Sequence, residues 1–284
     1  MCCPLSRTVA ALYWRMAREG DGKTALVTGA SAGIGKAFAE LLAAKGYGLV
    51  LTARRRDRLD ELASQLGTQH GVATHVIVAD LAELDAPARI VDAVRAQDLH
   101  IDFLVNNAGY GVPGSYVKVS WPDHQRFIQI MMTAVCDLTY RLLPPMLERG
   151  WGRVINIASV AGMVPAPAGH TLYGASKAFV IRFSEALAAE SAPKGVNVTA
   201  VSPGFTYSEF HDVTGTRQQM SSVPAMLWLN ATDVAREGYD AVMRGDSLVV
   251  NGRVYRFLIW LIGVVPRTLV MAVSASVGRR YRKT

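Results

Sequence analysis

Cysteine is scarce in this chain, and so are the patterns that mark repetitive or disordered proteins. The 284 residues include three cysteines, Cys2, Cys3 and Cys136, which cannot build a disulfide framework and favour a reducing compartment. We find no internal repeat, low-complexity tract or Gly/Ser linker. With 50% hydrophobic and 19% charged residues, the composition is that of a globular protein with a large core.

The chain also lacks an unbroken apolar segment of the length that spans a membrane. A spanning helix needs about 20 apolar residues, and the most apolar stretch, 257–278, is interrupted by Pro266 and Arg267. A charged residue at the centre of a span costs about 2.5–3.5 kcal/mol. Near the beginning, Arg15 and Arg18 interrupt the short apolar run that a secretory signal would extend. We therefore expect a cytoplasmic protein.

Acidic residues are nearly missing from the two ends of the chain, and this explains the net charge of +7. Residues 245–284 hold seven arginines and lysines against Asp246 alone, and residues 1–20 hold three arginines against Glu19. The basic residues accompany aliphatic ones rather than a nucleic-acid reader motif, so we expect no nucleic-acid partner. The tail has two open interpretations: it lies peripherally on an anionic membrane surface, or it packs on its own subunit or a twin.

Short apolar or β-branched runs alternate with helical patterns from about residue 24 to 250. This alternation predicts an α/β fold: a single Rossmann-like, doubly wound parallel sheet of about seven strands with helices on both faces. We expect strands at 24–28, 48–53, 73–79, 101–105, 152–158, 196–202 and 247–250. We expect helices at 34–45, 57–66, 86–97, 121–149, 172–192 and 232–244. Functional residues should then lie at the carboxyl ends of the strands.

A glycine-rich segment follows the first expected strand and opens the first expected helix. It runs from Thr28 to Gly35 with the pattern T-G-x-x-x-G-x-G. Glycines there let the backbone turn tightly and approach a pyrophosphate that the amides of a helix N-terminus hold. The strand–turn–helix context therefore predicts a dinucleotide site that includes Gly29, Ser31, Gly33, Ile34 and Gly35.

After the second expected strand, a basic run stands where an acid would grip the ribose 2′-hydroxyl of NAD. The run is Arg54-Arg55-Arg56, and a guanidinium suits a 2′-phosphate through charge-assisted hydrogen bonds. The alternative is that these arginines are solvated charges at the start of a helix. We favour Arg54 as a ligand of the 2′-phosphate and NADP(H) over NAD(H).

The helix after the fifth expected strand carries the candidate acid–base residues. Tyr173 and Lys177 are four residues apart, so phenol and ammonium share one helix face. A nearby ammonium and an oxidised nicotinamide both favour the phenolate, so we expect the pKa of Tyr173 to be lowered and the phenol to exchange the substrate proton. Ser159, just past the fifth strand, would hold the substrate oxygen beside Tyr173.

Together these motifs resemble the short-chain dehydrogenase/reductase family, whose patterns are T-G-x-x-x-G-x-G, N-N-A-G, a serine before Y-x-x-x-K, and a later P-G. All four occur here in that order, within about residues 23–250. The resemblance implies an oxidoreductase that acts on a carbonyl or secondary alcohol and forms homodimers or homotetramers. Its catalytic residues would be Ser159, Tyr173 and Lys177.

The resemblance also extends the expected cofactor site. It implies that Asp80 contacts adenine, that Lys177 binds the nicotinamide ribose, and that the turn after the sixth strand contacts nicotinamide. The complete set of expected cofactor contacts is Gly29, Ser31, Gly33, Ile34, Gly35, Arg54, Asp80, Leu81, Asn107, Ala108, Gly109, Tyr173, Lys177, Pro203, Gly204 and Thr206. The chain then divides into a basic, helical extension (1–20), a dinucleotide-binding catalytic domain (21–250) and a basic hydrophobic tail (251–284).

One position departs from the family pattern. Where the family usually has an asparagine that holds a relay water, the alignment places Met131, and a thioether is a weak acceptor and no donor. Either proton exchange is slowed, or Met131 simply packs while another water path serves. Met131 is also the one hint of the alternative function, a catalytically weak dinucleotide-binding scaffold or sensor; the intact Ser159, Tyr173 and Lys177 speak against it.

The segment after the P-G turn should cover the substrate. Residues 205–229 are rich in large apolar side chains, including Phe205, Phe210 and Trp228, and we expect a lid over a lipophilic substrate, with simple packing as the alternative. His170 and His211 flank the expected cleft. No histidine or cysteine spacing fits a metal site, so we expect no metal and a packing or solvated role for both.

Overall fold

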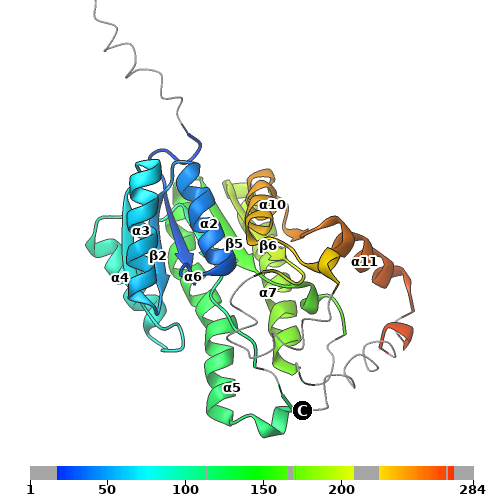
Figure 1. Ribbon diagram of the computed structural model, residues 1–284. Helices are drawn as coiled ribbons and strands as arrows, with labels where there is room; N and C mark the ends of the chain where they lie inside the picture. Colours follow the sequence, from blue (N-terminus) through cyan, green and yellow to red (C-terminus); the bar gives the residue numbers. More distant parts are fainter. Residues whose placement is uncertain are drawn as a thin grey trace, which may run out of the picture.

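The computed structural model describes residues 18–112, 114–165, 169, 171–207, 224–266 and 268–271. Its centre is a sheet of seven parallel strands in the order β3-β2-β1-β4-β5-β6-β7 (Figure 1). The strands are β1 Thr24–Thr28, β2 Gly48–Ala53, β3 Thr74–Val78, β4 Phe103–Asn106, β5 Gly152–Ile157, β6 Val196–Ser202 and β7 Leu248–Val250. The Rossmann-like fold class predicted from the sequence is confirmed, and the strand order reverses between β1 and β4, where such sheets bind ligands.

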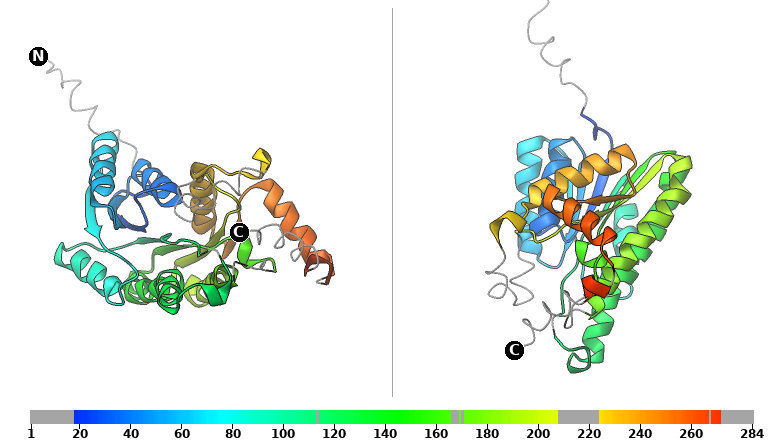
Figure 2. Two further views of the ribbon diagram at one scale, coloured as in Figure 1. Left: turned by 60° about the horizontal axis from the view of Figure 1, so that its bottom comes forward. Right: turned by 90° about the vertical axis from the view of Figure 1, so that its right-hand side faces the viewer.

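Helices cover both faces of the sheet, as the alternating sequence pattern predicts. One layer consists of α2 Gly33–Ala44, α3 Arg56–His70 and α10 Ala231–Arg244; the other consists of α4 Ala86–Ala96, α6 Ala134–Glu148 and α7 Thr171–Ser191 (Figure 2). Short helical turns lie in the connections: η1 Tyr116–Lys118, η3 Val160–Gly162, η4 Ala192–Lys194 and η5 Ala225–Leu227. The sequence predicts that the second helix ends near Leu66. It continues to His70, and Gly71, at φ +64°, closes it in the left-handed conformation that glycine favours.

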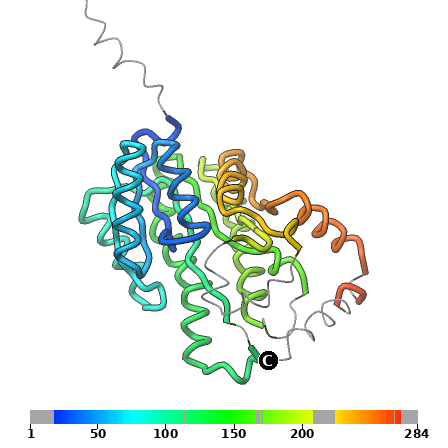
Figure 3. Tube along the Cα trace, in the orientation of Figure 1, coloured from blue at the N-terminus to red at the C-terminus, as the bar shows by residue number. Residues whose placement is uncertain are grey.

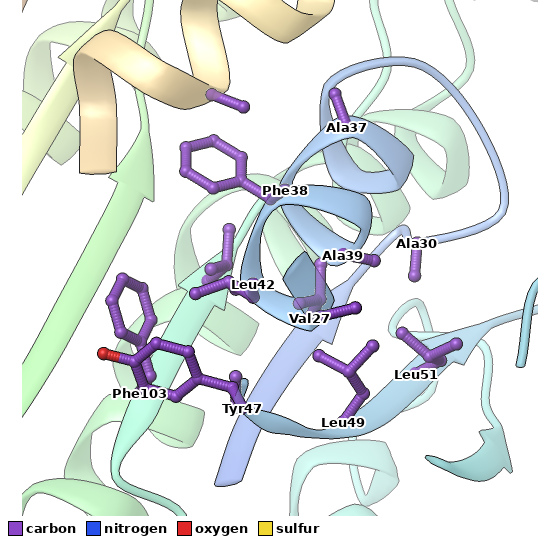
Figure 4. Packing of buried hydrophobic residues seen from close by; sticks show 14 of the residues in the cluster. Val27, Ala30, Ala37, Phe38, Ala39, Leu42, Tyr47, Leu49, Leu51 and Phe103 are labelled. Atoms are coloured by element: carbon purple, nitrogen blue, oxygen red, sulfur yellow. The ribbon is translucent and has the colours of Figure 1, made fainter. Parts of the chain in front are cut away.

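The core is split by the sheet into two apolar layers. Under α2 and α3, Phe38 and Leu42 pack against Val27, Leu49 and the β2 side of the sheet (Figure 4). On the opposite face, α4 and α6 cover Leu26, Val50, Leu104 and Val154. Strands buried on both faces give continuous apolar runs, which is why the sequence predicted their positions closely. This two-sided burial holds the carboxyl ends of the strands in fixed relative positions.

The long helix predicted over 121–149 contains a break in its regular hydrogen bonding. It consists of α5 Trp121–Ile128, a π-helical turn η2 Gln129–Thr133 and α6. The wider π turn packs against α7 and carries Met131, which is buried. A π turn inside an α-helix re-aims a few side chains, and here it does so beside the helix that bears Tyr173 and Lys177.

A last helix, α11 Arg253–Val264, follows β7 and stands apart from both layers. The ribbon and the Cα trace show it extending beyond the sheet edge near α10 (Figures 1 and 3). In the described part of the chain, no helix is both long and apolar enough to cross a membrane. Most of the predicted extension 1–20, and residues 272–284 of the predicted tail, lie outside the described residues.

Candidate active site

The glycine-rich turn between β1 and α2 has the geometry of a phosphate cradle. Gly29 and Gly33 have φ values of +65° and +56°, which favour glycine. A Cβ at Gly29 would lie 2.8 Å from the side-chain nitrogen Nδ2 of Asn107, and one at Gly35 would collide with the carbonyl of Gly29. The turn can therefore be this tight only because these positions have no side chain.

The N-terminus of α2 leaves its backbone donors available to an anion. Its N-cap residue is Ala32, whose side chain makes no capping hydrogen bond. The first amides of a helix lack partners within the helix and attract negative charge. Ser31, Gly33 and Ile34 surround this end, so the residues present fit a cofactor pyrophosphate as the sequence predicts.

The segment after β4 braces the glycine turn from the side. The Thr28 hydroxyl accepts hydrogen bonds from the backbone N–H groups of Asn107 (2.9 Å) and Ala108 (3.0 Å). The Asn107 side chain in turn donates to the carbonyls of Thr28 (2.9 Å) and Gly29 (3.3 Å). The sequence predicted Asn107 and Ala108 as cofactor contacts. Their protein contacts fix the shape of the turn that would receive the cofactor.

The basic run after β2 lies beside the same turn. Arg54 is exposed at the end of β2, whereas Arg55 reaches back and donates from Nη2 to the Ser31 hydroxyl at 2.9 Å. The sequence singled out Arg54 and missed Arg55, because nothing in three consecutive arginines tells which one turns toward the glycine segment. The Arg55 guanidinium and the Ser31 hydroxyl thus lie together beside the glycine-rich turn.

The family resemblance predicts that Asp80, just after β3, contacts adenine. Asp80 accepts a hydrogen bond from the Ala82 N–H at 3.0 Å, and its second oxygen lies 3.4 Å from Nη2 of Arg126 in α5. Leu81 is buried in the apolar layer under α4. Asp80 is thereby held at the rim by its own turn and by the long helix.

Ser159, Tyr173 and Lys177 converge at the carboxyl ends of β5 and β6. Ser159 follows β5 and hydrogen-bonds to the Tyr173 hydroxyl, while its own hydroxyl also lies 3.4 Å from the Pro203 carbonyl. Lys177 is buried, donates from Nζ to the Ile157 carbonyl at 2.7 Å, and lies 5.8 Å from the centre of the Tyr173 ring. The spacing along α7 thus brings a phenol, a hydroxyl and an ammonium together.

Burial is the main influence on the pKa values of Tyr173 and Lys177. It lowers the pKa of Lys177 to about 8, because a buried ammonium loses its hydration. Burial also raises the pKa of Tyr173, and the hydrogen bond with Ser159 only partly opposes this. The sequence led us to expect a lowered pKa for Tyr173, and the protein's own groups do the reverse. At neutral pH the phenol therefore keeps its proton and can donate it.

The turn after β6 completes the edge of the site. The Pro203 carbonyl accepts from the Val160 N–H at 3.1 Å, and the Thr206 hydroxyl donates to the Gly204 carbonyl at 3.1 Å. A Cβ at Gly204 would collide with the ring of Tyr255 from α11. The predicted residues Pro203, Gly204 and Thr206 thus lie in one turn that touches both the Ser159 segment and the last helix.

Tyr255 is a site residue that sequence reasoning missed. Its buried hydroxyl accepts a hydrogen bond from the Phe205 N–H at 3.0 Å and donates one to the Leu227 carbonyl at 2.8 Å. These two partners flank the predicted lid, so a single phenol ties both of its ends to α11. No sequence signal marks Tyr255, because its partners lie 28 and 50 residues away along the chain.

Met131, the position that departs from the family pattern, is buried in the π turn η2. It is 2% exposed, and a Cβ at Gly109 would lie 2.9 Å from its sulfur. The thioether therefore packs on the N-N-A-G segment beside the catalytic helix. The Met131 sulfur is a weak hydrogen-bond acceptor, whereas the asparagine of the family pattern has an amide there.

Several predicted features lie outside the described residues. They are His170, His211, Phe210 and the middle of the predicted lid, 208–223. Among the residues that the structure describes, no group of three or more His, Cys, Asp or Glu side chains could hold a metal ion.

Comparison with known proteins places this site in a family context. The family model described as short chain dehydrogenase matches residues 23–219. A very-long-chain 3-oxoacyl-CoA reductase from Anas platyrhynchos is 37% identical over 93% of this chain and 82% of its own length, and nodulation protein G from Rhizobium sp. (strain N33) is 36% identical over 82% and 97%. A solved short-chain dehydrogenase from Sphingobium yanoikuyae in complex with NADPH has a TM-score of 0.74 and 34% identity, covering 80% of this chain and 87% of that one.

Proposed function

Because the chain belongs to the short-chain dehydrogenase family, we propose that it is an NADP(H)-dependent oxidoreductase acting on a carbonyl or secondary alcohol of a lipophilic substrate. The observation that carries the proposal is the convergence of Ser159, Tyr173 and Lys177 beside the Pro203–Gly204 turn. It supports the proposal because a phenol, a hydroxyl and an ammonium lie together at the carboxyl ends of β5 and β6.

The cofactor would be held along the crevice between β1 and β4. The turn from Gly29 to Gly35 and the start of α2 suit the pyrophosphate, Asp80 suits the adenine side, and Gly204 lies at the nicotinamide end. Arg54 and Arg55, the latter bonded to Ser31, suit a 2′-phosphate through charge-assisted bonds. When bound, the cofactor supplies or accepts the hydride.

The proton chemistry falls to residues of this chain. In the direction of reduction, the substrate carbonyl oxygen would accept hydrogen bonds from Ser159 and Tyr173, and Tyr173 would donate its proton as the carbon receives the hydride. The raised pKa of Tyr173 keeps that proton available at neutral pH. The Lys177 ammonium would stabilise the phenolate that remains and would hold the nicotinamide ribose.

The substrate class is inferred from the rim of the site and from a relative. Phe205, Tyr207 and Trp228 form a row of aromatic rings, with centroids 5.8 Å apart for Phe205 and Trp228 and 4.8 Å apart for Tyr207 and Trp228. An apolar rim suits a lipophilic chain. The relative from Anas platyrhynchos is named as a very-long-chain 3-oxoacyl-CoA reductase, so we propose a 3-oxo thioester with a long acyl chain as the first substrate to test.

The alternative proposal is a dinucleotide-binding scaffold with weak catalysis. It is supported by the packing of Met131 on Gly109, which puts a thioether where a relay water would be bound. It is opposed by the assembled Ser159, Tyr173 and Lys177, which a scaffold does not need.

Turnover with a panel of substrates separates the two proposals. Oxidation of NADPH and of NADH is followed with 3-oxoacyl thioesters of increasing chain length, an aliphatic ketone and a polar sugar ketone. We expect NADPH-dependent reduction that improves with chain length. Cofactor binding without turnover of any carbonyl or alcohol would favour the scaffold, and equal use of both cofactors would contradict the role of Arg54.

A further inference from the structure

Helix α11 is hydrogen-bonded to the body of the protein through residues at its beginning. The Gly252 N–H donates to the Glu237 carboxylate at 3.2 Å, and Tyr255 is bonded to Phe205 and Leu227. Tyr255 is the only buried residue of the helix. The remaining turns extend beyond the helical layers (Figure 2), and the side of α11 opposite Tyr255 is exposed.

The exposed side of α11 carries a regular apolar stripe. Phe257, Trp260, Leu261 and Val264 recur at intervals of three and four residues and are 58%, 61%, 39% and 62% exposed. At about 100° per residue this stripe lies on the side of the helix nearly opposite Tyr255. The helix therefore faces the protein with Tyr255 and the half-buried Leu258, Ile259 and Ile262, and faces outward with four large apolar side chains.

The charged side chains on α11 are all positive. Arg253 and Arg256 are exposed and lie one turn before Phe257 and Trp260, on the same side of the helix. From residue 247 to the end, the sequence contains seven arginines and lysines and no acid. A symmetric contact with a second copy would bring these like charges together, whereas an anionic surface would attract them.

We propose that α11 docks on an anionic lipid surface, with its apolar stripe in the interface and Arg253 and Arg256 at the lipid phosphates. Exposed aromatic and aliphatic residues beside cations are the features that hold an amphipathic helix at such a surface. Since Tyr255 is hydrogen-bonded to Phe205 and Leu227, docking of α11 would bring these two residues near the lipid. The proposal goes beyond the proposed reaction and is independent of it.

Vesicle sedimentation of the full chain tests the inference without any turnover. Vesicles of phosphatidylcholine with phosphatidylglycerol are compared with vesicles of phosphatidylcholine alone, at low and high salt. We expect binding to the anionic vesicles that weakens with salt. The double variant Phe257→Ser/Trp260→Ser should bind at least about tenfold more weakly, and Arg253→Gln/Arg256→Gln should lose about fivefold for each charge removed.

Matched controls keep the experiment decisive. Tyr140→Ser and Leu84→Ser remove exposed apolar side chains elsewhere on the surface and should bind as the parent does. A chain that ends at Met271 should keep stripe-dependent binding. The proposal is wrong if the parent ignores anionic vesicles, or if the stripe variants bind unchanged. In the latter case, light scattering that shows a dimer becoming a monomer would assign the stripe to a second copy.

Discussion

The substitution Tyr255→Phe removes one oxygen atom at the base of the predicted lid. The ring can still pack on Gly204, but the Phe205 N–H loses its acceptor and the Leu227 carbonyl loses its donor. Both partners lie close to the turn that is expected to contact the nicotinamide. We therefore expect the variant to loosen the nicotinamide end of the site and to leave the adenine end intact.

The expected magnitude follows from the two hydrogen bonds. Each contributes about 1 kcal/mol net, so Tyr255→Phe should lower the free energy of unfolding by about 2 kcal/mol. If about half of that loss appears at the Pro203–Gly204 turn, NADPH binding should weaken about fivefold. The fragment 2′,5′-ADP, which carries only the adenine half of the cofactor, should bind as it does to the parent.

The assay combines calorimetric binding of NADPH and of 2′,5′-ADP with steady-state kinetics below the unfolding transition. Tyr239→Phe is the matched control, because it removes a 2.6 Å hydrogen bond to Glu19 far from the carboxyl ends of the strands. The control should lower stability and leave KM for NADPH unchanged. Tyr255→Phe with lowered stability but parental NADPH affinity, KM and kcat would refute the reasoning.

Three further predictions address the cofactor, the buried lysine and the departure from the family pattern. Arg54→Asp should weaken NADPH binding about ten- to a hundredfold and invert the preference over NADH; equal affinities of the parent for both cofactors, by nicotinamide fluorescence, would contradict the role of Arg54. The pKa of Lys177, lowered by burial to about 8, means that the unfolded chain binds the extra proton between about pH 8 and 10. Stability should therefore rise with pH in that window in urea unfolding, and Lys177→Met should abolish the rise; the same slope in parent and variant would show that Lys177 is not its source. Met131→Asn should raise kcat severalfold by holding a relay water, at a loss of about 2 kcal/mol of apolar burial; a parental solvent isotope effect of one with no gain in the variant would make Met131 a packing residue only.

The sequence predicted the sheet well because its inner strands are buried on both faces. A mostly apolar run such as 48–53 has few other places in a globular fold. The four-residue spacing of Tyr173 and Lys177 likewise predicted that they share a helix face, since that follows from helix geometry alone. These features depend on local patterns.

Features that depend on distant contacts were not predictable in the same way. Which of the three arginines hydrogen-bonds to Ser31 depends on the position of Ser31 in the folded chain, and it is Arg55. The contacts of Tyr255 likewise depend on two segments far away in the sequence. The π turn at Gln129–Thr133 is likewise absent from the predicted uninterrupted helix. The pKa direction of Tyr173 depends on how deeply the folded chain buries the phenol, which spacing does not report.

The most direct test of the proposed chemistry is the turnover of Tyr173→Phe with NADPH and the best carbonyl substrate found. The ring still packs, so cofactor affinity should stay within a few-fold of the parent, while loss of the proton donor should lower kcat at least about a hundredfold. Near-parental turnover by a folded Tyr173→Phe variant would contradict the assignment of Tyr173 as the acid and, with it, the account of the site.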